Sequence, residues 1–547
     1  MMNIKKIDKF IRSSKNYDDL ISKISELPKE ENKFKGDVFE RFCEIYLNVS
    51  PAHRLKIKDV WRLEQLPRKI REDLGIPKED EGIDIIVRTK DQKYWSVQCK
   101  YRSNKDQAIT RKELTTFTDL SFQVAKGISH GLVMHTSKKE IKKRNLIKNV
   151  SYIDHAHWIE IGDYWSAIQK YCVTQKVDKI NPLTPWPHNK KVIEDAVTHF
   201  INDQKSRGKL IMPCGSGKSL CSYWIAEELG ADSIIFAAPS INLVSQSLNR
   251  WTRELIAKGE DVDYLVICSD ETAAITDDEI DMNTSEVGIP CTTDVEEISA
   301  FLKKKNKKKI IFTTYQSTKK LCEAAKEANV NFDLCIFDEA HRTVGEKKDR
   351  PFSRLLYQEN IKIEKRVFMT ATERVFRGHN KNVVSMDDKS LYGERFHLLS
   401  YKEAIKQKII TDYKIVTISV TESEIAQMIQ DNRYLNIENI DIEDTAQQIA
   451  STIALRKLMK EERVNKSISF HRTIKLAKNF SSQQKEIDHH KLLHPMIESF
   501  HVSSKQTSGD RKDIMKEFSD SEKALLTNAR CLTEGVDIPS VEAVIFA

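Results

Sequence analysis

The chain has 547 residues, of which 40% are hydrophobic and 31% charged, a composition typical of a folded protein of about three domains. Its net charge of +7 excludes a surface that is basic throughout, so any nucleic-acid-binding surface must be a local groove. The ten cysteines form no CxxC pair, and no apolar run reaches the roughly 18 residues of a membrane span. We therefore expect reduced thiols, a cytoplasmic location and no membrane partner.

The N-terminal region predicts a helical lead-in followed by a mixed α/β domain. Residues 1–33 are charged and helical in pattern, and the pattern becomes mixed over 34–178. The segment 36–47 has apolar residues at helical spacing and carries Glu40. Alternating apolar runs predict strands at 82–89, 94–101 and 131–136.

The first two of these strands predict a β-hairpin with polar side chains in proximity. Gln98 and Lys100 share one face because side chains alternate along a strand, and strand pairing brings Asp84 close to them. Such groups support metal-assisted phosphodiester hydrolysis: Asp84 and Gln98 would bind Mg²⁺, and Lys100 would position or activate water. Glu40 could direct its carboxylate to the same site. The alternative is a solvated hairpin in which Asp84 and Lys100 pair across the strands.

Three prolines at 182, 185 and 187 interrupt regular structure and mark a domain boundary. Beyond them, buried β-branched runs alternate with helical segments, which indicates a doubly wound parallel sheet. The predicted strands of this series lie at 208–213, 233–239, 264–269, 309–315, 333–337 and 366–370. A second series lies at 413–418, 467–470, 524–528 and 543–547. We expect two lobes of the same kind, 179–398 and 399–547.

The string MPCGSGKS at 212–219 follows a predicted strand and precedes a predicted helix. Gly215 and Gly217, with Ser216 between them, allow backbone N–H groups to approach phosphate oxygens closely. Lys218 would supply a charge between the β- and γ-phosphates of ATP, and Ser219 would offer its hydroxyl to Mg²⁺. Residue 212 is methionine where the common pattern has glycine.

The string DEAH at 338–341 closes another predicted strand. Asp338 would be a Mg²⁺ ligand, Glu339 would orient or deprotonate the attacking water, and His341 would sense the γ-phosphate. The alternative is an acidic strand end beside a helix start, where carboxylates favour the helix dipole. The phosphate-binding string earlier in the chain favours the ATP site.

Together these strings resemble superfamily 2 helicases and translocases, which have two RecA-like lobes. The resemblance implies further contacts with the nucleotide or with nucleic acid, at Asn189, Ser240, Gln246, Thr370, Thr372, Thr533, Gly535 and Asp537. Asn189 would read adenine, Thr370 and Thr372 would couple hydrolysis to lobe movement, and Gly535 and Asp537 would face the nucleotide. Ser240, Gln246 and Thr533 would contact the nucleic-acid backbone.

In that family an arginine-rich motif follows the last predicted strand, where this sequence stops at Ala547. Such an arginine is worth about 10³–10⁵ in rate in related phosphoryl-transfer enzymes. We therefore expect a C-terminally truncated second lobe and weak ATP hydrolysis by these residues alone.

The helix with Glu40, the GID string and the QxK string resemble the Mrr-like branch of PD-(D/E)xK restriction endonucleases. A nuclease followed by a motor resembles the front portion of type ISP restriction–modification enzymes. The resemblance implies an α/β fold with a restriction-endonuclease-like domain followed by two RecA-like lobes with doubly wound parallel sheets, the second incomplete.

The implied function is that of an ATP-dependent DNA helicase or translocase coupled to a Mg²⁺-dependent endonuclease in restriction or DNA defence. Its partner would be DNA, most simply duplex, and a methyltransferase or target-recognition module would lie in a continuing chain or a separate subunit. One alternative is a repair or RNA-processing helicase whose first domain only binds nucleic acid. Another is a non-catalytic fragment that binds nucleic acid.

Overall fold

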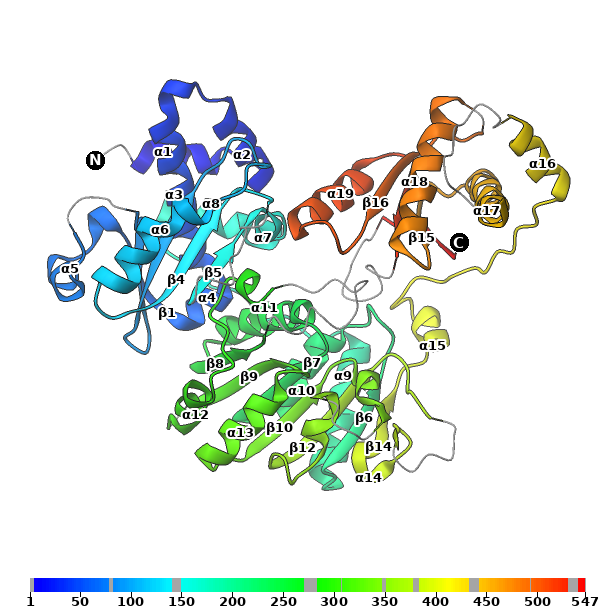
Figure 1. The fold of residues 1–547 in the computed structure, drawn as a ribbon. Helices are drawn as coiled ribbons and strands as arrows, with labels where there is room; N and C mark the ends of the chain where they lie inside the picture. The colour runs from blue at the N-terminus through cyan, green and yellow to red at the C-terminus, as the bar shows by residue number, and fades with distance from the viewer. Residues whose placement is uncertain are drawn as a thin grey trace. The chain divides into compact units, whose positions relative to one another are not determined.

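The computed structural model describes residues 4–77, 82–139, 149–269, 283–305, 307–346, 351–376, 383–431, 442–491, 493–529 and 540–546. They form two compact units, one of the described residues up to Asp412 and one of those from Tyr413 onward (Figure 1). Within these ranges, no helix combines the length and the apolar character that crossing a membrane requires.

The first unit begins with a domain built on a five-stranded mixed sheet. Its strands follow the order β1 (Ile57–Arg62), β2 (Ile85–Thr89), β3 (Tyr94–Lys100), β4 (Ile128–His135) and β5 (Val150–Ile153). The first three pair antiparallel and the last three pair parallel. Side chains alternate between two cores: Ile85 and Val87 enter one, and Ile86 enters the other.

Helices cover both faces of this sheet. One core is shared with α1 (Ile4–Arg12), α2 (Tyr17–Glu26), α3 (Asn32–Val49), α7 (His155–Ile159) and α8 (Trp165–Thr174). The other is shared with α5 (Arg68–Leu74) and α6 (Arg111–Asp119). The segment expected to be a lead-in therefore packs into the core of this domain, since α1 and α2 bury apolar side chains there.

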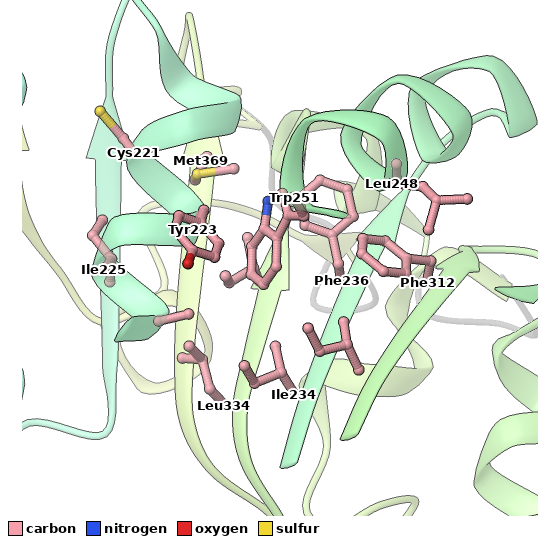
Figure 2. Close-up of a cluster of buried hydrophobic side chains, with 14 of the residues drawn as sticks. Cys221, Tyr223, Ile225, Ile234, Phe236, Leu248, Trp251, Phe312, Leu334 and Met369 are labelled. Carbon is pink, nitrogen blue, oxygen red and sulfur yellow. The ribbon is translucent and has the colours of Figure 1, made fainter. Parts of the chain in front are cut away.

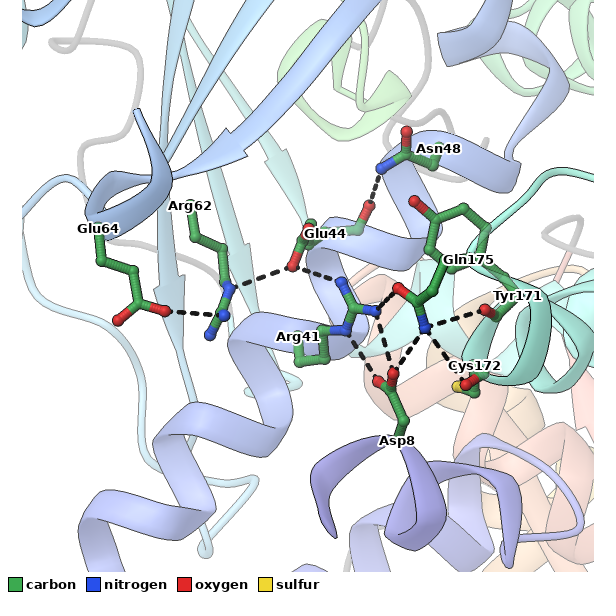
Figure 3. Close-up of polar contacts among 9 residues, drawn as sticks. All are labelled: Asp8, Arg41, Glu44, Asn48, Arg62, Glu64, Tyr171, Cys172 and Gln175. Carbon is green, nitrogen blue, oxygen red and sulfur yellow. Dashed lines mark hydrogen bonds and ion pairs between the residues drawn. The ribbon is translucent and has the colours of Figure 1, made fainter. Parts of the chain in front are cut away.

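A buried ion-pair network joins α1 to α3 and β1 (Figure 3). Arg41 Nε lies 2.9 Å from Asp8 Oδ1, and Arg41 Nη1 lies 2.9 Å from Glu44 Oε2. Arg62 Nε lies 3.3 Å from the same Glu44 oxygen, and Gln175 Nε2 donates to Asp8 Oδ2 at 2.8 Å. Buried charges are tolerated only when paired, so this network couples the N-terminal helix to the helix that carries Glu40.

The next domain, which we call lobe 1, has a seven-stranded sheet in which every pairing is parallel. The strands follow the order β14 (Glu394–Leu398), β6 (Arg207–Ile211), β12 (Ile363–Thr370), β10 (Phe332–Phe337), β7 (Ser233–Ala238), β9 (Lys308–Thr314) and β8 (Val262–Ile267). One face packs on α9 (Pro187–Val197), α10 (Lys218–Glu228) and α11 (Ile241–Lys258), and the other on α12 (Val295–Lys303), α13 (Thr318–Ala328) and α14 (Lys389–Tyr392). The six strands predicted for this lobe are present, and β14 adds an edge.

Figure 2 shows the core beneath α10 and α11, with Trp251 at its centre. The Trp251 ring makes edge contacts with Tyr223 of α10, Phe236 of β7 and Phe312 of β9. Its indole Nε1 also donates to the Ser219 carbonyl at 3.3 Å. Aromatic packing and this hydrogen bond together hold the first turn of α10 against α11.

The short helix α4 (Pro51–Lys56) belongs in sequence to the first domain but packs on lobe 1. Ala52 and Leu55 are buried in the same hydrophobic cluster as Trp251. Tyr264 Oη donates to the Ala52 carbonyl at 2.8 Å. His53 Nε2 lies 3.1 Å from the Gly288 carbonyl of lobe 1, and its Nδ1 lies 2.9 Å from Ser50 Oγ. Apolar burial and hydrogen bonds thus join the two domains.

We expect the first unit to lose stability on mild acidification because of His53. Burial lowers the pKa of His53 to about 4, below its ordinary value of 6.5. The unfolded chain binds the proton more tightly, so stability falls as pH falls from about 6.5 towards 4, by about 2 kcal/mol at pH 5. Tryptophan fluorescence measures this directly, because all seven tryptophans lie in the first unit.

The check compares thermal unfolding of the wild type with that of His53→Gln at pH 7 and pH 5. The stability advantage of the wild type over the variant should shrink at pH 5, whereas His489→Gln, at an exposed histidine of the second unit, should leave the pH response unchanged. An equal pH response in the wild type and His53→Gln would contradict the assignment.

The second unit contains a four-stranded parallel sheet in the order β16 (Glu498–Val502), β17 (Ala524–Asn528), β15 (Lys466–Phe470) and β18 (Ala543–Phe546). Its helices are α16 (Glu422–Asp431), α17 (Ile442–Glu461), α18 (Ile474–His489) and α19 (Ser508–Asp520). The strand predicted at 413–418 was wrong: the segment forms no strand, and Ile415 is 83% exposed. Strand β16 was not predicted.

The structural boundary between the units also differs from the expected one after residue 398. The chain continues with lobe 1 through α15 (Tyr401–Lys406) as far as Asp412. Leu399 and Ala404 are buried in the lobe 1 core, and the Leu399 N–H donates to the Ile211 carbonyl at 2.9 Å. These contacts extend lobe 1 past β14.

Candidate active sites

The predicted phosphate-binding loop connects β6 to the N-terminus of α10. Gly215 and Gly217 have φ values of +79° and +93°, a backbone region that side chains with a Cβ rarely enter. Ser216 is fully buried, and its Oγ donates to the Pro213 carbonyl at 2.6 Å, which closes the loop. Helix N–H groups behind a glycine loop form an anion cradle.

Met212, the departure from the common pattern, has a structural explanation. Its side chain is fully buried in the lobe 1 core, and its N–H donates to the Thr370 carbonyl at 3.0 Å. Lys218 Nζ donates to the Met212 carbonyl at 3.3 Å. The methionine therefore belongs to the core and leaves the loop unobstructed.

The acidic pair follows β10 directly. Asp338 is buried, and burial, with the adjacent Glu339 charge, raises its pKa to about 6. Burial also opposes ionisation of Glu339, but a hydrogen bond from His341 and the charge of Lys218 lower its pKa overall. Glu339 is held in the left-handed region at φ +47°, which costs about 1–3 kcal/mol. An ionised Glu339 can accept a proton or orient a water.

His341 connects the acidic pair to the predicted coupling motif on β12. Its Nδ1 lies 3.3 Å from Glu339 Oε2 and 3.0 Å from Thr370 Oγ1. Thr370 Oγ1 in turn donates to the Thr372 carbonyl at 2.9 Å. The neighbouring strands β10 and β12 thus place four predicted residues in one chain of polar contacts.

Two residues of α9, the helix that precedes β6 in the chain, also contact the loop. Asn189 Nδ2 donates to the Ser216 carbonyl at 3.1 Å, and His188 Nε2 lies 3.0 Å from the same oxygen. Asn189, expected to read adenine, thus uses its amide to hold the loop, and His188 was not identified from the sequence. The sequence signal that could have identified His188 was its position next to Asn189.

Arg250 is a second residue that sequence reasoning missed. Its Nη1 donates to Ser219 Oγ at 2.9 Å from the adjacent helix α11. Nothing in the sequence distinguishes it from other cations on an amphipathic helix, because only packing brings α11 against α10.

The predicted nucleic-acid contacts are placed in part. Ser240 is the N-cap of α11, where its Oγ accepts a hydrogen bond from the Leu243 N–H at 3.3 Å, and Gln246 lies half-buried on the same helix. Thr533, Gly535 and Asp537 lie outside the described residues.

In the first domain, the hairpin register brings the predicted nuclease residues together. Ile85 pairs with Val97, so the preceding Asp84 faces Gln98. Asp84 Oδ2 accepts a hydrogen bond from the Cys99 N–H at 2.5 Å. Gln98 is buried, and its Oε1 has no hydrogen-bond partner among the residues that the structure describes. Lys100 ends β3 and is half-buried.

Glu40 lies on α3, which shares a buried core with β3. Burial raises the pKa of the Cys43 and Cys99 thiols, and the charges of Glu40 and Asp84 raise both further. The predicted residues Glu40, Asp84 and Gln98 thus come from α3, the residue before β2, and β3.

The donor set suits a hard divalent cation. Carboxylate and amide oxygens are ligands of Mg²⁺, which usually retains several waters. Leaving the buried Gln98 oxygen unsatisfied costs about 1–3 kcal/mol, which a bound ion would recover. Among the residues that the structure describes, no group of three or more His, Cys, Asp or Glu side chains could hold a metal. Any ion here would therefore depend on the Gln98 amide and on water.

Three family models match successive parts of the chain. An Mrr-type model described as a restriction endonuclease matches residues 48–175. The model of the type III restriction enzyme res subunit matches residues 182–374, and that of the helicase conserved C-terminal domain matches residues 450–547.

Individual relatives agree with these models. A probable helicase of African swine fever virus is 27% identical over 351 residues, which are 63% of this chain and 35% of the viral protein. The protein of another strain of this virus is 26% identical over the same length. Among solved structures, the ATP-dependent Type ISP restriction-modification enzyme LlaBIII bound to DNA superposes with a TM-score of 0.78 at 25% identity.

That superposition covers 97% of this chain and 35% of the restriction–modification enzyme, so the chain spans about a third of the length of the proteins it matches. The predicted α/β fold and the resemblance to Mrr-like nucleases, superfamily 2 helicases and type ISP enzymes are confirmed. The chain therefore carries a restriction-endonuclease domain followed by the two lobes of a helicase, and over nearly its whole length it is similar to a type ISP restriction–modification enzyme.

Proposed function

We propose that the chain is the cutting and motor part of a restriction enzyme, in which ATP hydrolysis moves or separates DNA and an endonuclease cuts it. One observation carries the motor assignment: the contacts from Glu339 through His341 to Thr370 join the acidic pair to the coupling motif beside the phosphate loop. The alternative, in which the acidic pair only favours a helix dipole, would not require these contacts. The alignment of Asp84 with Gln98 supports the nuclease in the same way.

In the motor, Lys218 and the loop N–H groups would bind the ATP phosphates, and Ser219 and Asp338 would hold Mg²⁺. Bound Mg²⁺ would neutralise phosphate charge and align the leaving oxygens. Glu339, whose pKa is lowered by its hydrogen bond with His341 and by the charge of Lys218, would orient the attacking water. Gly535 and Asp537 are the further residues that we propose as nucleotide contacts.

In the nuclease, Asp84 and Gln98 would hold Mg²⁺, and Glu40 would direct its carboxylate to the same site. The ion would polarise the scissile phosphate and lower the pKa of a bound water. Lys100 would position that water or offset the charge that develops on the phosphate. The oxygen-rich donor set is the reason for proposing Mg²⁺ rather than a softer metal.

The proposed partner is duplex DNA, tracked through its phosphates by Ser240, Gln246 and Thr533 in a cytoplasmic setting. The similar type ISP enzyme was solved bound to DNA. A methyltransferase or target-recognition module would act with this chain, either in a longer protein or as a separate subunit. Recognition of the backbone implies binding that weakens steeply with salt.

A nucleic-acid panel tests the proposal. We expect duplex DNA to stimulate ATP turnover by the 547-residue chain more than single-stranded DNA or RNA does, and to be cut only with a divalent cation present. Strongest stimulation by RNA without DNA cutting would instead support the RNA-processing alternative. Nucleic-acid binding without nucleotide binding would support the non-catalytic alternative.

A further inference from the structure

Arg250 lies beside Ser219, one of the two residues proposed to hold Mg²⁺ in the motor. Its Nη1 donates to Ser219 Oγ at 2.9 Å. The guanidinium comes from α11, whereas Ser219 belongs to the first turn of α10.

The neighbouring Trp251 side chain is held in place by packing, whereas the exposed Arg250 side chain can change its conformation. Trp251 is 1% exposed at the centre of the cluster in Figure 2, and its Nε1 donates to the Ser219 carbonyl at 3.3 Å. Arg250 is exposed and its Nη1 bonds only the Ser219 side chain among the hydrogen bonds of that guanidinium that the described structure contains. Its departure from Ser219 would therefore leave the packing of α11 on α10 intact.

The Arg250 guanidinium and a divalent cation compete for Ser219 Oγ. Both are positive, and at a few ångströms in a partly buried site their repulsion is weakly screened. The hydroxyl lone pair that accepts from Arg250 is also one that a metal ligand needs free.

We propose that Arg250 is a positioning residue that stands in for the metal: it holds the Ser219 hydroxyl until Mg²⁺ arrives with ATP, and then leaves that oxygen. This inference rests on the proposed ATP site. It places a nucleotide-sensitive side-chain contact on α11, the helix that is capped by Ser240 and carries Gln246, both proposed to contact DNA.

The test is a binding measurement that requires no turnover. A fluorescent ATP analogue is titrated with Mg²⁺ at pH 8 in every variant. Removing the competitor in Arg250→Gln should lower the Mg²⁺ concentration at half-saturation by about three- to tenfold, the range that the net contribution of one typical hydrogen bond gives. Arg250→Lys should restore part of the wild-type requirement.

Lys258→Gln is the matched control. Lys258 is a cation at the end of the same helix, and its side chain pairs with Glu227 rather than with Ser219. It should leave the Mg²⁺ midpoint unchanged. A Mg²⁺ concentration at half-saturation that rises or stays the same in Arg250→Gln overturns the inference. If the glutamine variant fails to fold, Arg250→Ala takes its place and its result is interpreted in the same way. Failure of the wild type to bind the analogue at any Mg²⁺ concentration would instead refute the proposed ATP site.

Discussion

Lys218→Ala should reduce nucleotide affinity and DNA-stimulated ATP turnover by about 10²–10³-fold, the usual cost of removing a preorganised charge from a developing anion. Lys218 is 9% exposed at the first position of α10, with Nζ bound to the Met212 carbonyl. Its charge also lowers the pKa of both Asp338 and Glu339. Loss of the lysine thus removes the phosphate contact and leaves the acidic pair harder to ionise. Fluorescent-nucleotide binding and phosphate release measure the two losses separately.

Lys320→Ala is the control for this experiment, because Lys320 is an exposed cation of α13 in the same lobe, paired with Glu323. It should bind nucleotide as the wild type does. Unchanged nucleotide binding by Lys218→Ala, with tryptophan fluorescence showing a folded unit, would be evidence against an ATP site at this loop.

Asp84→Asn should reduce DNA cleavage by at least about 10³-fold, because a neutral amide cannot replace the charge that holds and activates a divalent cation. DNA-stimulated ATP turnover should be unchanged, since Asp84 lies in the first domain. The asparagine side-chain oxygen can still accept the hydrogen bond that Asp84 Oδ2 receives from the Cys99 N–H, so the hairpin should remain folded. Cleavage of labelled duplex DNA and phosphate release, measured on the same samples, separate the two activities.

Asp59→Asn provides a matched change in the same sheet. Asp59 lies on β1 and accepts a hydrogen bond from Arg88 Nε at 2.7 Å. Arg88 pairs with Tyr94 near the hairpin turn, at the opposite end from Asp84 and Gln98. This variant should cut DNA as the wild type does. Cleavage by Asp84→Asn at the wild-type rate would mean that the hairpin is a solvated structural element, the alternative that its sequence left open.

The predicted strands show where local pattern is sufficient. Each of the six predicted strands of lobe 1 contains an apolar run that becomes buried, so their sequences carry a strong signal. The run at 413–418 has the same local character, yet Ile415 is exposed and the segment pairs with no strand in the described part of the chain. β16 was missed because Glu498 and His501 interrupt its apolar pattern. Burial by neighbours, not the run itself, separates these cases.

The sequence by itself determined the parts whose chemistry is local. Glycines with positive φ precede Lys218, two carboxylates follow a buried strand, and Gln98 and Lys100 alternate on another, all within a few residues. Such features depend on backbone preferences and strand geometry, which short segments carry.

Only the tertiary structure decided which of these parts meet. The hairpin register sets Asp84 against Gln98, and adjacent strands bring His341 to Thr370. Packing places Arg250 on Ser219 and inserts α4 into the core of lobe 1. These contacts join residues far apart in the chain, and their partners are selected by burying apolar surface across whole domains, a condition that no short segment records.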